Sequence, residues 1–95
     1  MHQYELMFIM HPTTEAEAQE AITERVKELI EQGNGSVAEI RKWGKRRLAY
    51  EIADQREGIY VLVLFQAESV VCNEIDRVLK ITEPVIRFMI VRSES

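Results

Sequence analysis

The chain has 95 residues, 46% of them hydrophobic, which is enough for one hydrophobic core and too few for two. Its formal net charge is −4, and its longest apolar run, Ile59 to Phe65, is too short to cross a bilayer. The N-terminal residues lack the features of a secretion signal, and Cys72 is the only cysteine, which excludes an internal disulfide. We therefore expect one cytoplasmic domain spanning residues 1–95.

A strand and a helix are predicted first. Apolar residues occupy both faces of a period-two pattern from Tyr4 to Met10, which predicts a strand ended by Pro12. Residues 14–17 have the spacing of a capping box, and apolar side chains then recur at helical spacing until Gly33. This pattern predicts a helix over about residues 15–32, whose acidic outer face should be exposed and should repel nucleic acid.

A long hairpin comes next. Residues 36–52 are predicted as a strand, and Gly44 within it indicates a bulge or a bend. Residues 53–58 are polar and predict a turn. The run 59–65 is so apolar that it predicts a central strand of the sheet.

A second helix beginning at Ser69 and closed before Pro84, followed by a strand over 85–92, completes the order βαββαβ. This order is typical of the α+β, ferredoxin-like sandwich, in which a four-stranded antiparallel-type sheet carries two helices on one face. Right-handed crossovers then put the first and third strands in the centre and the second at an edge. The other face of the sheet is left uncovered.

Positive charge is concentrated on this predicted edge strand. Five of the twelve Lys and Arg residues lie in one short segment, namely Arg41, Lys42, Lys45, Arg46 and Arg47. The rest of the chain carries −9 (−4 minus +5), so the cluster is a local feature on an acidic body. Such a patch attracts phosphate groups. On spacing alone, an edge strand charged to prevent aggregation explains the cluster equally well.

No catalytic or metal-binding constellation is found, and no cofactor is expected. His2 and His11 are nine residues apart, so on one regular strand they would face opposite sides of the sheet. The same architecture includes the acylphosphatases, whose phosphate loop needs an Arg directly after the first strand. This chain has His-Pro-Thr-Thr at 11–14, so we do not expect an enzyme.

A second protein class with this architecture is the RNA-recognition motif, whose third strand stacks bases on aromatic side chains. The corresponding positions here are Ile59, Val61 and Leu64. We therefore expect no aromatic platform for bases, while binding through charge and shape stays open.

The segment 43–52, Trp-Gly-Lys-Arg-Arg-Leu-Ala-Tyr-Glu-Ile, resembles the bacterial small-subunit ribosomal protein six family. The likeness runs essentially end to end and includes Tyr4-Glu5, His11-Pro12, Gly58 with Tyr60, Val85-Ile86-Arg87 and Val91-Arg92. Three departures are His2 where a basic residue is common, Glu51 where proline is frequent, and the missing acidic C-terminal extension of some members.

The resemblance implies a non-catalytic protein that binds the central domain of 16S rRNA as a heterodimer with small-subunit ribosomal protein eighteen. We expect the isolated chain to be a monomer. It implies RNA-binding roles for Lys45, Arg46, Arg47, Arg87, Arg92 and Tyr4, to which the charge cluster adds Arg41 and Lys42.

The uncovered sheet face offers an apolar surface for the partner. We name Phe88, Leu64 and Leu62 as candidate partner-binding residues, although strand alternation must put about half of the apolar strand residues in the core. The alternative is a small ligand-binding or regulatory domain of the same architecture, which would form a homodimer through this face.

Overall fold

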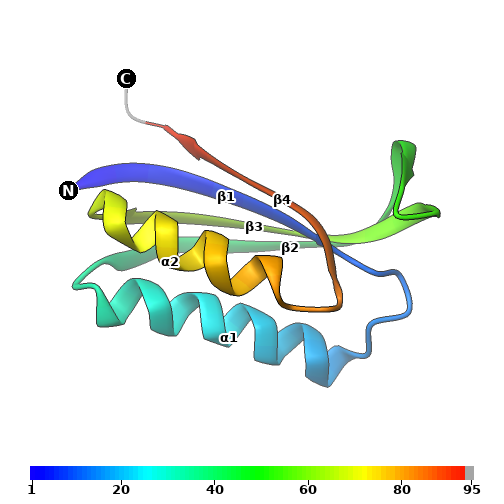
Figure 1. Ribbon diagram of the computed structural model, residues 1–95, viewed down its shortest axis with the longest axis horizontal. Helices are drawn as coiled ribbons and strands as arrows, with labels where there is room; N and C mark the ends of the chain where they lie inside the picture. The colour runs from blue at the N-terminus through cyan, green and yellow to red at the C-terminus, as the bar shows by residue number, and fades with distance from the viewer. Residues whose placement is uncertain (94–95) are drawn as a thin grey trace.

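The computed structural model describes residues 1–93 and has the predicted order βαββαβ (Figure 1). Its elements are β1 (His2–Met10), α1 (Ala16–Gln32), β2 (Ser36–Ile52), β3 (Gln55–Ala67), α2 (Ser69–Lys80) and β4 (Val85–Arg92). The strands form one antiparallel sheet in the order β2-β3-β1-β4, and both helices cover the same face. The prediction of β1 and β3 as central strands and β2 as an edge strand is confirmed.

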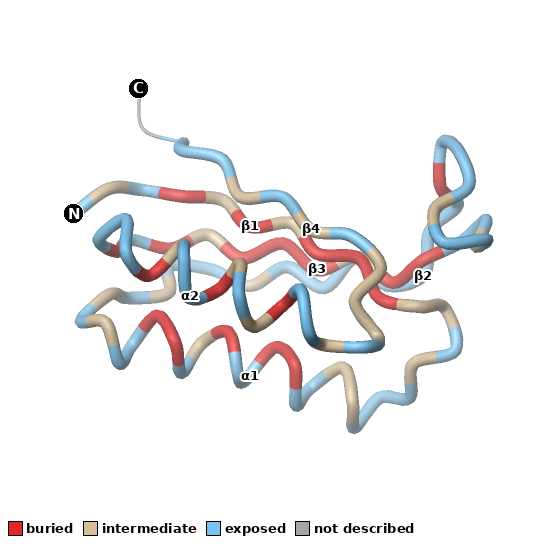
Figure 2. Tube along the Cα trace, in the orientation of Figure 1, coloured by how far each residue is buried: buried red, intermediate tan, exposed pale blue. Residues whose placement is uncertain are grey.

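The core lies between the sheet and the helices, where strand alternation directs every second side chain. On β1 these helix-facing residues are Tyr4, Leu6, Phe8 and Met10, all buried, and their cross-strand neighbours on β3 run from Phe65 back to Ile59. The helices contribute one apolar stripe each, including Val26 and Ile30 on α1 and Ile75 and Leu79 on α2. Figure 2 shows this buried layer, with exposed residues on the outer sides of both helices.

Two local predictions need correction. The polar turn expected over 53–58 occupies only Ala53 and Asp54, whose φ values of 51° and 64° form a two-residue reversal, so β3 already begins at Gln55. Positive φ at both central residues matches the twist of the flanking strands. The capping box does not form either, because the hydroxyl of Thr14 donates to the carbonyl oxygen of His11, 2.7 Å away.

The far end of the β2–β3 hairpin curls over the open face of the sheet. Figure 1 shows this tip rising sharply from the plane of the strands. Tyr50 of β2 thereby reaches Arg87 of β4, although β3 and β1 lie between these two edge strands. The guanidinium carbon of Arg87 is 5.9 Å from the centre of the Tyr50 ring, and one of its nitrogens donates to the Tyr50 hydroxyl.

At Gly35, just before β2, the backbone passes close to the backbone of β3. A Cβ placed there would lie only 2.4 Å from the carbonyl oxygen of Gln66 in β3. We expect Gly35→Ala to lower the free energy of unfolding by about 1–3 kcal/mol, because the strands must shift to admit the methyl group. Urea denaturation measures the change, with Ser36→Ala at the exposed neighbouring position as control. Equal midpoints for the two variants would contradict the tight packing at this residue.

Candidate functional site

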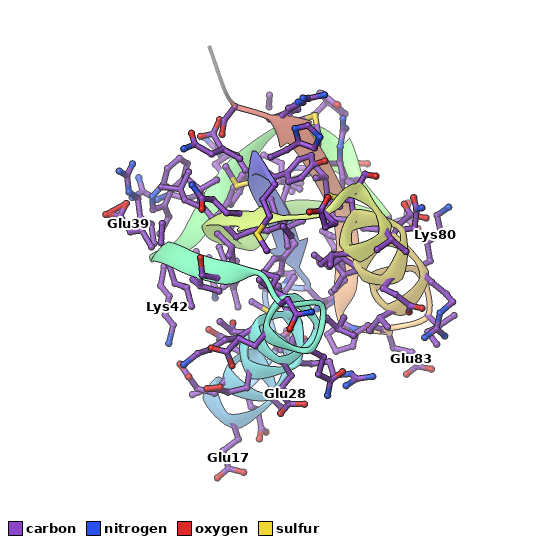
Figure 3. All side chains as sticks on the ribbon, turned by 90° about the vertical axis from the view of Figure 1, so that its left-hand side faces the viewer. Glu17, Glu28, Glu39, Lys42, Lys80 and Glu83 are labelled. Atoms are coloured by element: carbon purple, nitrogen blue, oxygen red, sulfur yellow. The ribbon has the colours of Figure 1, made fainter. Side chains whose placement is uncertain are left out.

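The five cations of the edge strand differ in whether a carboxylate accompanies them. Arg41 pairs with Glu39 on its own strand, and Lys42 pairs with Glu20 of α1. Figure 3 shows Lys42 extending from β2 on the side where α1 lies. Within residues 1–93, no salt bridge engages Lys45, Arg46 or Arg47. These three exposed residues, which we call the unpaired cations, are therefore the part of the cluster available for phosphate groups.

A bulge at Gly44 sets how this strand presents its side chains. The pairing with β3 shifts register between Lys42 and Gly44, and Gly44 has a φ of 73°, a conformation that favours glycine. Trp43 is the extra residue in the bulge. Beyond it, Lys45 pairs with the core residue Ile59 and Arg46 with Gly58, so successive cations point to opposite faces of the edge.

The bulge also places Trp43 on the open face, where its ring stacks on Tyr60 of β3. The ring centres are 6.4 Å apart and the planes are inclined by 20°. Trp43 remains 41% exposed, and Nε of Arg46 donates to its carbonyl oxygen at 3.1 Å. A surface hollow of about 380 Å³ is lined by these three residues.

The expectation of no aromatic platform concerned Ile59, Val61 and Leu64 of the third strand, none of which is aromatic. The Trp43–Tyr60 pair lies outside those positions, because it combines a bulged residue of β2 with one residue of β3. The sequence feature that could have indicated this pair is Trp43 followed by Gly44 inside a predicted strand, because a bulge changes the direction of the side chain it contains.

The other proposed RNA-binding residues lie away from this cluster. Arg87 and Arg92 are exposed on β4, the opposite edge strand, and Arg92 lies beside the His2 ring. Tyr4 is on β1 with its ring in the core, 8% exposed and stacked on Phe65 at a centre distance of 5.5 Å. Because the helices and the sheet enclose this ring, the prediction that Tyr4 contacts RNA does not agree with its burial.

The open face of the sheet carries a second apolar surface. A groove of about 260 Å³ lies between this face and the curled hairpin tip, and its wall consists of Met7, Ile9, Leu48, Ala49, Tyr50, Ile52, Tyr60, Arg87, Phe88 and Met89. Beside it, a hollow of about 240 Å³ is lined by Glu5, Met7, Trp43, Leu62, Met89 and Val91. The two share Met7 and Met89, so apolar side chains are continuous across the sheet.

The three predicted partner-binding residues divide between the two faces. Leu62 and Leu64 lie on the open face, Leu62 buried beneath its neighbours and Leu64 half-buried opposite Glu5 and Glu39. Phe88 pairs with Phe8 across β1 and β4 and packs against the core, so the expectation that it belongs to the open face is corrected, although it also contributes to the wall of the groove. Its neighbour Met89, which is 52% exposed, occupies the position on the open face.

The environment of Cys72 changes the pKa of its thiol. Burial raises the pKa of the Cys72 thiol above its ordinary value, while a hydrogen bond with Tyr4 partly lowers it. Cys72 is thus a protonated, half-buried side chain at neutral pH.

Among residues 1–93, no three His, Cys, Asp or Glu side chains come together as a metal site. Neither described helix has the length and apolar character needed to span a membrane.

The family model for ribosomal protein S6 matches residues 3–92 of the chain. Small ribosomal subunit protein bS6 of Carboxydothermus hydrogenoformans is 47% identical over 94 residues, which cover 99% of this chain and 98% of that protein. The bS6 protein of Moorella thermoacetica is 46% identical over 94 residues, covering 99% and 96%. The crystal structure of 30S ribosomal protein S6 from Thermotoga maritima has a TM-score of 0.89 at 33% identity, covering 96% of this chain and 86% of that one.

Proposed function

The chain belongs to the ribosomal protein S6 family, and we propose that it is a non-catalytic component of the small ribosomal subunit in the cytoplasm. In this role it binds the central domain of 16S rRNA together with small-subunit ribosomal protein eighteen. Residues 1–95 act as one domain, of which residues 94 and 95 lie outside the described part. The relatives above are named as small-subunit proteins, which supports the place of this chain in that particle.

One observation carries the RNA-binding part of the proposal. The unpaired cations Lys45, Arg46 and Arg47 lie on an exposed edge strand of a protein whose net charge is −4. Cations on an edge strand also help to resist aggregation, whether or not a carboxylate pairs with them. Three adjacent cations without carboxylates, next to two that have them, are better suited to a polyanion. Arg41 and Lys42 would join the contact by exchanging a carboxylate for a phosphate.

Arg87 and Arg92 are proposed to contact RNA at the opposite edge of the sheet from the unpaired cations. Both lie on β4, which β1 and β3 separate from the cationic strand β2, so they would meet a separate stretch of RNA. Arg87 also lies at the rim of the apolar groove, where it contacts Tyr50. It could therefore hold the hairpin tip in place for the partner protein as well as contact RNA.

The partner is proposed to cover the open face. Its apolar residues are continuous from Leu62 through Met7 to Met89, and association through such a patch buries surface that is otherwise exposed to water. Leu64 lies on the same face toward the other end of β3. A basic partner would also offset the acidic body of this chain, which opposes RNA.

The isolated protein should bind ribosomal RNA weakly, because three phosphate contacts supply limited affinity and the remaining acidic surface repels the RNA. We expect adding small-subunit ribosomal protein eighteen to produce tight binding of a central-domain RNA fragment, as measured by filter binding. In lysates, the chain should sediment with small subunits.

Tight RNA binding by the isolated chain, unchanged by the partner, would contradict the proposal that both proteins are needed to bind the RNA. A homodimer in size exclusion would instead favour a ligand-binding domain.

A further inference from the structure

We propose that Trp43 and Tyr60 form a stacking platform for one unpaired nucleobase, with Arg46 binding an adjacent phosphate group. The inference rests on the proposed RNA-binding function and adds the group of the RNA that is recognised at this site. It concerns the hollow that Trp43, Arg46 and Tyr60 line.

The two rings are already arranged for stacking. They are nearly parallel, with an inclination of 20° and centres 6.4 Å apart, and Tyr60 is half-buried beneath the more exposed Trp43. The backbone of Trp43 is fixed by the bulge and by the hydrogen bond from Nε of Arg46 to its carbonyl oxygen. A base would therefore meet rings that lose little freedom on binding. Every nucleobase has a π-face, so such a platform does not require a particular sequence.

The charges around the rings favour a nucleotide over an apolar protein segment. Trp43 is flanked in sequence by all five cations of the cluster, and the unpaired cations follow directly after it and Gly44. Arg46 uses Nε for the Trp43 carbonyl, which leaves its two Nη groups for a phosphate. A ring face and a free guanidinium in one hollow complement the base and the phosphate of one nucleotide.

Trp43 reports on its own site, because it is the only tryptophan in the chain. The fluorescence of the complex with small-subunit ribosomal protein eighteen is measured before and after adding a central-domain RNA fragment. We expect RNA to quench Trp43, since a base stacked on the indole ring replaces water there. If the partner alone changes the fluorescence and RNA adds nothing further, the ring is covered by protein and the stacking proposal is overturned.

Two substitutions separate stacking from charge. Trp43→Leu should weaken RNA binding by the two-protein complex by about 5- to 150-fold, the range for one base–aromatic stack. Trp43→Phe should retain most of the affinity because it keeps an aromatic face. Neither variant should change the slope of affinity against salt, because stacking releases no counterions. Circular dichroism and the affinity for the partner protein, which should both stay unchanged, are the controls.

The other outcomes are equally decisive. Unchanged RNA affinity in Trp43→Leu, with the salt slope of the unaltered protein intact, would overturn the stacking platform and leave the RNA-binding function standing. A loss of partner affinity as large as the loss of RNA affinity would assign Trp43 to the protein interface and also overturn it. Absence of RNA binding by the unaltered two-protein complex would instead remove the proposed function itself.

Discussion

Replacing the unpaired cations Lys45, Arg46 and Arg47 together with Ala should flatten the salt dependence of RNA binding by about two to three units of log affinity against log salt. Each phosphate contact releases about 0.7 to 0.9 counterions. Three such contacts imply that raising salt from about 50 to about 200 mM lowers the affinity of the unaltered complex by about 20- to 40-fold through these residues alone. Cations of the partner protein add their own contribution, so the difference between variants is the informative quantity.

The matched control changes net charge equally but elsewhere. Replacing Arg25, Arg77 and Lys80 on the helices with Ala also moves the net charge from −4 to −7 (−4 minus 3). Each of these three already pairs with a carboxylate of its own helix, namely Glu28, Glu74 and Asp76. The helix triple variant should keep the slope, since these residues lie on the side of the sheet away from the hollow.

Thermal stability distinguishes the two explanations of the edge strand. Exposed cations without partners contribute little to folding, so the edge triple variant should melt close to the unaltered protein. An unchanged salt slope combined with a large loss of stability would mean that the cluster is a structural edge of the sheet. In that case the RNA contact lies at another surface.

The architecture was predictable because it follows from local patterns and the order of elements. The apolar run 59–65 requires a buried strand, and right-handed crossovers then force the cationic segment 36–52 to an edge. Gly44 likewise predicted a bulge, and the pairing of β2 with β3 contains one at that residue. These steps need no knowledge of which side chain faces which layer.

The faces of the strands could not be predicted in the same way. In β4, apolar residues occupy both alternate sets, so alternation alone does not tell Phe88 from Met89. The choice is made by pairing with β1, where Phe88 lies opposite the buried Phe8. The contact of Tyr50 with Arg87 is also inaccessible to local patterns, because it depends on how the hairpin tip curls over two other strands.

The position of Met89 leads to the second prediction. Met89→Asp should abolish pairing with small-subunit ribosomal protein eighteen while leaving the isolated fold intact. At 52% exposure, the carboxylate stays hydrated in the free protein. In the complex the partner would bury it without a matching charge, which is costly. Because RNA binding is proposed to need both proteins, it should be lost together with the pairing, as measured by isothermal titration calorimetry and filter binding.

Two comparison variants make this result specific. Ile81→Asp, at a position 73% exposed after α2 on the other side of the molecule, introduces the same charge and should pair normally. Phe88→Asp should instead unfold the protein, because Phe88 packs against the core beside Phe8. If Met89→Asp keeps a native circular dichroism spectrum and still pairs as tightly as Ile81→Asp, the open face is not the partner interface. The partner would then have to bind at an edge or at the helices, and the apolar groove under Tyr50 would need another explanation.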